Sequence, residues 1–172
     1  MACTITISGR GIPCRDAIGG VKRAWIGTFA DGIFGTPTAG ALTDSTAAKI
    51  VYGFDLVKNA SQLTQTINAE ATTGSVFYSQ VFECTIPKME AGVNAEIADL
   101  VKGHLVVIVE TLNGDKVILG HSNGCLVTGG TFVTGTNPGD LYGYTLTFTA
   151  EEKVPAPFLT GTQTNLTFTA GN

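Results

Sequence analysis

The chain has 172 residues, a length typical of one domain, and a formal net charge of −4. This acidic balance disfavours sequence-specific DNA or RNA binding, which needs basic side chains on one face to neutralise phosphates. Charged residues make up only 14% of the chain and hydrophobic residues 44%, so threonine and the 22 glycines must cover much of the surface. Such small neutral side chains lose little solvation when another subunit covers them, which favours an oligomer or filament subunit over an ordinary β domain with a threonine-rich surface.

The N-terminal region, residues 1–20, is predicted to form an arm in which residues 4–7 alternate between threonine and isoleucine. A first strand is predicted over residues 21–29, where Val21 and Trp25 fall on one face of a period-two pattern. The chain is therefore expected to enter its folded body near residue 21.

Residues 30–48 contain turn-forming residues too closely spaced for a regular element, and they predict a long loop or a hairpin tip. An irregular segment of this length is uncommon in a compact domain unless it has a function. Ile33 and Phe34 give the loop an apolar tip suited to docking on a neighbouring molecule. The other interpretation is a flexible loop with two incidental hydrophobic residues.

The middle of the chain combines strands with one helix. Short stretches of turn residues join the strands, which favours antiparallel hairpins. The predicted strands are residues 49–57, 62–68 and 76–86. An amphipathic helix is predicted over residues 88–102, because apolar residues recur at helical spacing from Met89 to Val101.

The C-terminal half is predicted to be rich in strands. Asn113-Gly114 favours a hairpin with a type I′ turn, because both residues tolerate positive φ angles. The strands expected on either side of this turn and after it are residues 104–112, 116–120, 124–134 and 141–150. Alternation in the last of these predicts that Tyr144, Leu146 and Phe148 face inward and that the threonines between them face outward.

The tail, residues 155–172, ends in an alternating run that contains Leu166 and Phe168. A terminal strand of this kind either completes the chain's own sheet or adds to the edge of a neighbouring subunit. Together with Ile33 and Phe34 of the long loop, Leu166 and Phe168 are the residues predicted to make contacts between subunits.

Residues 120–124 match the G-x-S-x-G pattern of hydrolases, in which glycines permit the sharp turn that exposes the serine. That mechanism needs a helix after the serine and, further along the chain, an acid and then a histidine. Here the next segment is a predicted strand, and the two histidines, His104 and His121, both precede Ser122. A glycine-containing turn is therefore favoured, no catalytic residue is assigned, and the chain is not expected to be an enzyme.

Neither a metal nor a cofactor is expected. The four cysteines, Cys3, Cys14, Cys84 and Cys125, lack the C-x-x-C spacing of zinc or redox sites, and reduced thiols are predicted. No apolar run reaches the roughly 18 residues of a membrane span, and the first residues lack the pattern of a signal peptide. The expectation is a protein without a membrane partner that is made and kept in a cytoplasm.

The order of arm, strands, single helix and β-rich C-terminal half resembles the tail-tube proteins of tailed bacteriophages and the similar tube subunits of contractile injection systems. The stretches that carry this resemblance are SGRGIPCRDAIGG at residues 8–20, VTGGT at 127–131 and GDLYGYTLTF at 139–148. The resemblance implies one mainly β domain over residues 1–172, an antiparallel β-sandwich or rolled β-barrel with one flanking α-helix. It also implies hexameric rings that stack into a hollow tube, in which the long loop commonly makes contacts between rings.

The partners implied by this resemblance are further copies of the chain and other tail proteins, with genomic DNA only as a non-specific passing cargo. The implied location is the virion tail, assembled in the cytoplasm of a host bacterium. Two alternatives remain open on the sequence alone. One is another virion component, such as a tail terminator, connector or capsid decoration protein, and the other is a monomeric β-sandwich binding module, which should display clustered exposed aromatic residues.

Overall fold

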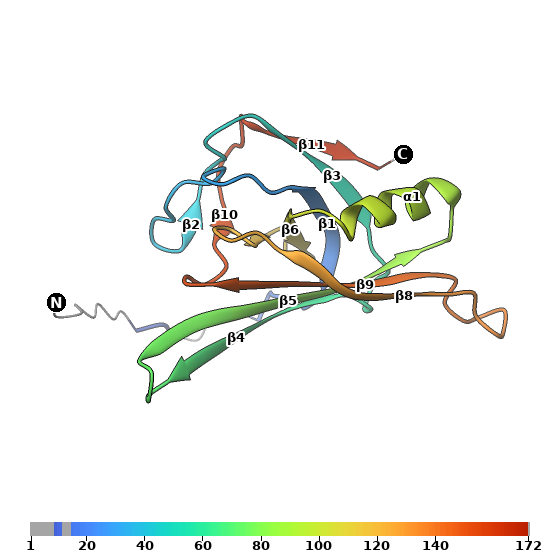
Figure 1. Ribbon diagram of the computed structural model, residues 1–172, viewed down its shortest axis with the longest axis horizontal. Helices are drawn as coiled ribbons and strands as arrows, with labels where there is room; N and C mark the ends of the chain where they lie inside the picture. Colours follow the sequence, from blue (N-terminus) through green and yellow to red (C-terminus); the bar gives the residue numbers. More distant parts are fainter. Residues whose placement is uncertain (1–8, 12–14, 172) are drawn as a thin grey trace.

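Two β-sheets pack face to face in a computed structural model of the chain, which describes residues 9–11 and 15–171 (Figure 1). The larger sheet has the spatial order β11 (Leu166–Ala170), β3 (Lys49–Asp55), β1 (Val21–Thr28), β6 (Leu105–Thr111), β7 (Lys116–Leu119), β10 (Phe158–Leu159) and β2 (Ala41–Leu42). The smaller sheet has the order β4 (Gln62–Glu70), β5 (Ser75–Pro87), β9 (Gly143–Glu152) and β8 (Leu126–Val133). One helix, α1 (Ala91–Leu100), lies beside the open side of the sandwich. The predicted mainly β fold with one helix is confirmed, and its form is a sandwich of two separate sheets.

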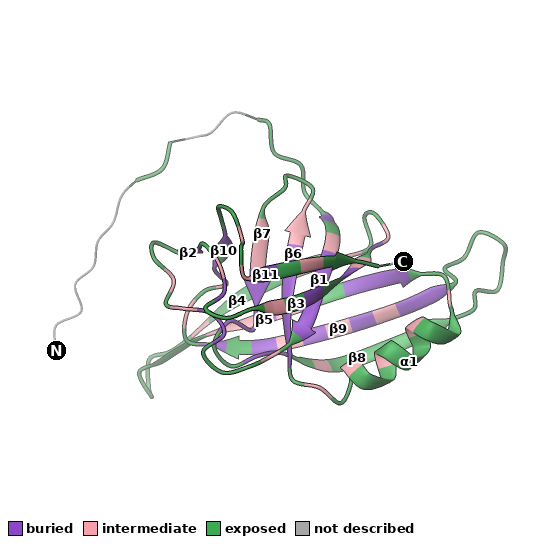
Figure 2. Cartoon of the chain, turned by 90° about the horizontal axis from the view of Figure 1, so that it is seen from above, coloured by how far each residue is buried: buried purple, intermediate pink, exposed green. Residues whose placement is uncertain are grey.

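Around its central strand β6, the larger sheet is buried on both faces, which explains the uninterrupted apolar sequence of that strand. Leu105, Val107 and Val109 belong to the core between the two sheets. Val106 and Ile108 point the other way, into a second core on the opposite face. Figure 2 shows buried residues in β1 and β6 of this sheet and in β9 of the smaller sheet, which packs against it. A strand covered on both sides reads as a continuous hydrophobic run instead of an alternating one.

The first strand differs from its predicted pattern. The pairing of β1 with β6 is irregular between Val21 and Arg23, so Val21 lies in the core between the sheets and Trp25 in the second core. The prediction that these two side chains share one face is wrong, because a bulge adds one residue to the strand. The indole of Trp25 then packs on Gly53, where an added Cβ would lie 2.6 Å from the ring.

The predicted hairpin after the helix is confirmed, but its turn is not of type I′. Of residues 111–115, only Gly114 has a positive φ, of 90°. The Thr111 N–H donates to the Asp115 carbonyl at 2.8 Å, and the Gly114 N–H donates to the Thr111 carbonyl at 3.1 Å. This pattern is the three-residue hairpin loop, in which a type I turn is followed by a glycine in the left-handed region.

The helix is shorter than the predicted 88–102. Strand β5 continues to Pro87, which is paired with Gly143, and the chain then turns at Lys88, whose φ is 64°. Met89 packs on the core between the sheets, but Val101 is 53% exposed. None of the ten residues of α1 is buried, so the helix covers the open side of the sandwich only partly.

Candidate assembly surface

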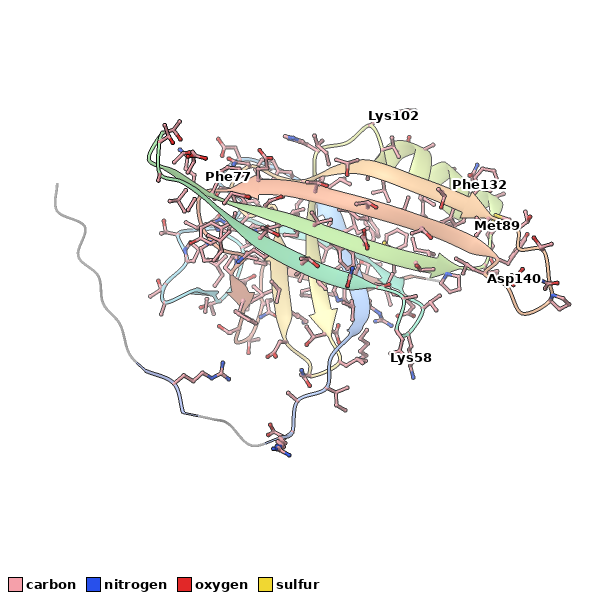
Figure 3. The ribbon with its side chains drawn as sticks, turned by 90° about the horizontal axis from the view of Figure 1, so that it is seen from below. Lys58, Phe77, Met89, Lys102, Phe132 and Asp140 are labelled. Atoms are coloured by element: carbon pink, nitrogen blue, oxygen red, sulfur yellow. The ribbon has the colours of Figure 1, made fainter. Side chains whose placement is uncertain are left out.

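The outer face of the smaller sheet, the face turned away from the core, carries neutral and acidic side chains and no basic ones. Along β9, Tyr144, Leu146 and Phe148 face the core, as predicted, so Thr145, Thr147 and Thr149 face outward. None of the four strands of this sheet contains a lysine or an arginine. Figure 3 shows this face, which runs unbroken across all four strands.

The acidic groups on this outer face are few and separated. Glu83 lies opposite Thr147, and Glu151 lies opposite Ser79, each with its side chain on the side away from the core. Their carboxylates give the face a weak negative charge among neutral threonines. A phosphate backbone placed against this face would meet no cation from the sheet itself.

Neither edge of the smaller sheet pairs with a further strand in the described part of the chain. Within the described residues, β4 pairs only with β5, and β8 pairs only with β9, which leaves one row of backbone groups unpaired on each outer side. The two edge strands are nine and eight residues long, and neither contains proline or a basic residue. Lysine and proline, which often protect such edges against pairing with another chain, are thus absent from both strands, and β8 carries one irregularity, between Val127 and Gly129.

Large apolar side chains are exposed at the two opposite ends of the same sheet. Ile67 is 64% exposed and Val76 is 55% exposed near the β4–β5 turn. Phe132 is 68% exposed and Tyr142 is 50% exposed at the other end, where β8 leads into β9. Figure 3 marks these ends with the labels Phe77 and Phe132. The exposed apolar surface therefore lies at both ends of the strands, beyond the part that the larger sheet covers.

The four predicted contact residues lie elsewhere. Ile33 and Phe34 are only 5% and 6% exposed and belong to the second core, together with Leu166. Phe168 is half-buried against Trp25, with ring centroids 4.9 Å apart in an edge-to-face arrangement. The predicted exposed apolar tip is wrong, because segment 30–48 folds back over the larger sheet and its hydrophobic residues complete that sheet's second core.

The terminal strand completes the chain's own sheet, which was one of its two predicted outcomes. β11 runs parallel to β3, with Phe168 opposite Val51. The segment before β11 is held by Asp44 of the 30–48 segment, whose carboxylate accepts backbone N–H bonds from Thr164 and Asn165 at 2.5 and 2.7 Å. The 30–48 segment thus has a structural function within the chain.

The turn at residues 120–124 is built around buried groups. His121 donates from Nε2 to the Gly35 carbonyl at 2.9 Å, because a carbonyl can only accept. Nδ1 shares a hydrogen bond of 2.8 Å with the Ser122 hydroxyl. The buried Glu152 carboxylate accepts the N–H groups of Ser122 and Asn123, both at 2.8 Å.

This arrangement does not form the nucleophile site of a hydrolase. The N–H groups that would have to stabilise an oxyanion next to Ser122 already donate to Glu152, and the strand β8 follows where the hydrolase pattern requires a helix. The contacts instead fix the turn to β9 and, through Gly35, to the 30–48 segment.

The described cysteines, Cys84 and Cys125, are buried and unpaired; Cys3 and Cys14, like residues 4–7 of the predicted arm, lie outside the described residues. Burial raises the pKa of both described thiols to about 12. They remain protonated and unreactive near neutral pH. Over the described ranges, no group of three or more possible metal-binding side chains comes together.

The one helix in the part of the chain that the structure describes is too short and too polar to cross a membrane. Comparison of the chain with family models, with curated proteins and with solved structures gives no match. The surface described above was therefore identified from this chain alone. A signal for it is present in the sequence: residues 59–87 and 117–152, which supply all four strands of the smaller sheet, contain no lysine or arginine.

Proposed function

We propose that this chain is a structural subunit of a bacteriophage tail tube, which polymerises as stacked rings and forms a conduit for the genome. The observation that carries the proposal is the smaller sheet, whose two edges pair with no further described strand and whose strands and outer face carry no basic residue. In the proposed assembly, this face lines the channel and the larger sheet lies outside it.

The geometry of the edges supports ring closure. All three strand pairs of the smaller sheet are antiparallel, so the first strand, β4, and the last, β8, run in opposite directions. When β8 of one copy meets β4 of a copy related by rotation about an axis along the strands, the new pair is also antiparallel. Such a head-to-tail contact closes into a ring, and a closed barrel has no remaining edge.

The chemistry of the outer face supports the passage of DNA. Bound phosphates are held mainly by lysine and arginine, with release of counterions, and a wall of threonines offers no such attraction. The carboxylates of Glu83 and Glu151 add a weak repulsion that keeps the duplex from adhering. The exposed apolar side chains at the strand ends, with Ile67 at one end and Phe132 at the other, are suited to contacts between one ring and the next.

Negative-stain electron microscopy of the purified protein over a range of concentrations tests this proposal. The wild-type chain should form closed rings and, at high concentration, hollow rods. A variant with Thr66→Lys on β4 and Thr131→Lys on β8 places two cations across each joint and should remain monomeric with a nearly unchanged unfolding midpoint. Thr36→Lys, on an exposed loop, is the matched control and should assemble.

A wild-type chain that remains monomeric at every concentration would contradict the proposal. So would an edge variant that assembles as well as the control. Rings that never stack would contradict the tube and favour another ring-forming virion component.

A further inference from the structure

A groove runs between the helix α1 and the strand β3 on the open side of the sandwich. It consists of two adjoining cavities, of about 470 and 490 Å³, which share Tyr52, Phe54 and Glu96 in their walls. The floor is the alternating row Ile50, Tyr52 and Phe54 of β3, of which Ile50 is 50% exposed and Tyr52 is 56% exposed. Two large apolar side chains thus lie open beside a helix that has no buried residue.

The wall opposite this floor is acidic. Glu96 and Asp99 are three residues apart on α1 and line the same cavity, so their carboxylates lie on one side of the helix. Among the described residues, neither takes part in a salt bridge. An apolar floor with an acidic wall fits an extended segment that carries hydrophobic side chains at alternate positions and a basic residue close by.

We propose that the groove binds the N-terminal arm of a second copy of this chain. The arm has that composition: Ile5 and Ile7 alternate with threonines, and Arg10 follows three residues later. In an extended strand, residues two apart point the same way at a spacing of about 7 Å, which is also the spacing along the row Ile50, Tyr52 and Phe54. Ile5 and Ile7 therefore pack on that floor, and Arg10 pairs with Glu96 or Asp99.

The direction in which the described part of the arm leaves the body favours binding to the groove of a neighbouring copy over binding to the groove of its own chain. The Ile18 N–H donates to the Asn113 side chain at 2.8 Å, and the Gly20 carbonyl accepts the Leu112 N–H at 3.1 Å, which ties the arm to the β6–β7 turn. Figure 2 shows residues 15–20 leaving the body at this turn, away from α1. From residue 18 to residue 5, an extended chain covers up to about 45 Å, enough to reach an adjacent molecule.

The proposal rests on the proposed self-assembly only in requiring that copies of this chain meet. It is tested by a disulfide between the two predicted ion-pair positions, Arg10→Cys and Glu96→Cys, in a chain that also carries Cys3→Ser and Cys14→Ser. The protein is concentrated, oxidised and run on a denaturing gel without reductant. The matched control replaces Glu96→Cys with Lys58→Cys, an exposed position outside the groove.

A ladder of dimers and higher multimers is expected for the Arg10/Glu96 pair, at least tenfold stronger than for the Lys58 control. A disulfide confined to single chains would show that the arm binds its own groove and would overturn the proposal. So would the absence of a disulfide, or a control ladder of equal strength. Electron microscopy of the same samples separates the two claims, because rods without the ladder overturn the arm exchange alone, and the ladder without rings or rods overturns the tube alone.

Discussion

Replacing Asp44 with asparagine should loosen the terminal strand β11 without disturbing the core. The Asp44 Oδ2 atom accepts the N–H groups of Thr164 and Asn165 and, at 2.8 Å, the Thr164 hydroxyl. Oδ1 accepts the N–H groups of Ser45 at 2.8 Å and Leu166 at 3.3 Å. One carboxylate thus satisfies donors from two segments that lie more than a hundred residues apart in the sequence.

The expected loss of unfolding free energy is about 2 kcal/mol. A hydrogen bond to a charged group contributes roughly 1.5–3 kcal/mol when buried, but Asp44 is half-exposed, so water replaces part of what is lost. Asparagine keeps one acceptor oxygen and loses the other together with the charge. For a chain of this length, the expected loss lowers the thermal midpoint by about 4–8 °C.

The effect should also depend on pH. Burial opposes ionisation of Asp44, but the hydrogen bonds from Asn165, Thr164 and Ser45 outweigh it and lower the pKa to about 2 from the ordinary 3.8. Because the pKa is lower in the folded state, the ionised carboxylate stabilises the fold above pH 4, and this stabilisation is lost as the pH falls through 3.8 toward 2. Urea denaturation of wild type and variant should give a constant difference above pH 5 that shrinks below pH 4. Equal stability of wild type and variant at pH 7, or a difference that stays constant down to pH 2, would refute the stabilising role of the Asp44 carboxylate. Asp31→Asn, at an exposed position, is the control.

Three further predictions concern the core. Gly53→Ala should lower the free energy of unfolding by about 1–3 kcal/mol, because the added Cβ would lie 2.6 Å from the neighbouring indole. Gly92→Ala in α1, where an added Cβ meets no atom within 4 Å, should instead raise it by about 0.5–1 kcal/mol. Urea denaturation compares the two variants, and equal effects would contradict the packing of Trp25 on Gly53. Phe148→Ala should cost about 3–5 kcal/mol in the same assay, since the ring is fully buried; a loss below about 1 kcal/mol would contradict this burial. In a chain whose other two cysteines are serine, Cys84 and Cys125 should not react with a thiol reagent at pH 8 until urea unfolds the protein; rapid labelling of the folded chain would contradict their burial and raised pKa.

Much of the smaller sheet could be predicted from the sequence, because its strands are covered on one face only. Alternation in β9 identified Tyr144 and Phe148 as core residues and the threonines between them as outward-facing. The hairpin at Gly114 was predicted because few residues other than glycine and asparagine adopt its left-handed backbone. In both cases, local sequence and tertiary environment impose the same requirement.

The centre of the larger sheet was harder to predict, because β6 is covered on both faces and alternation carries no information there. Ile33 and Phe34 have the composition of an exposed tip, and only the tertiary structure shows that they cover the second core. The bulge beside Arg23, which places Val21 and Trp25 on different faces, depends on pairing with Glu110 and Thr111, about 90 residues later. Contacts of that range leave no periodic pattern in the local sequence.

The absence of basic residues from the smaller sheet is difficult to explain for a monomer. Lysine at an exposed strand edge is the usual protection against unwanted pairing, and it costs a folded monomer almost nothing. All ten basic residues of this chain nevertheless lie outside the four strands, so the two edge strands, β4 and β8, carry none. An edge that must accept the next copy cannot carry this protection, and a channel wall that must release DNA cannot carry cations. The absence of basic residues therefore meets both requirements of the proposed tube, an edge open to the next copy and a wall that does not bind DNA. The fold of a single chain requires neither property.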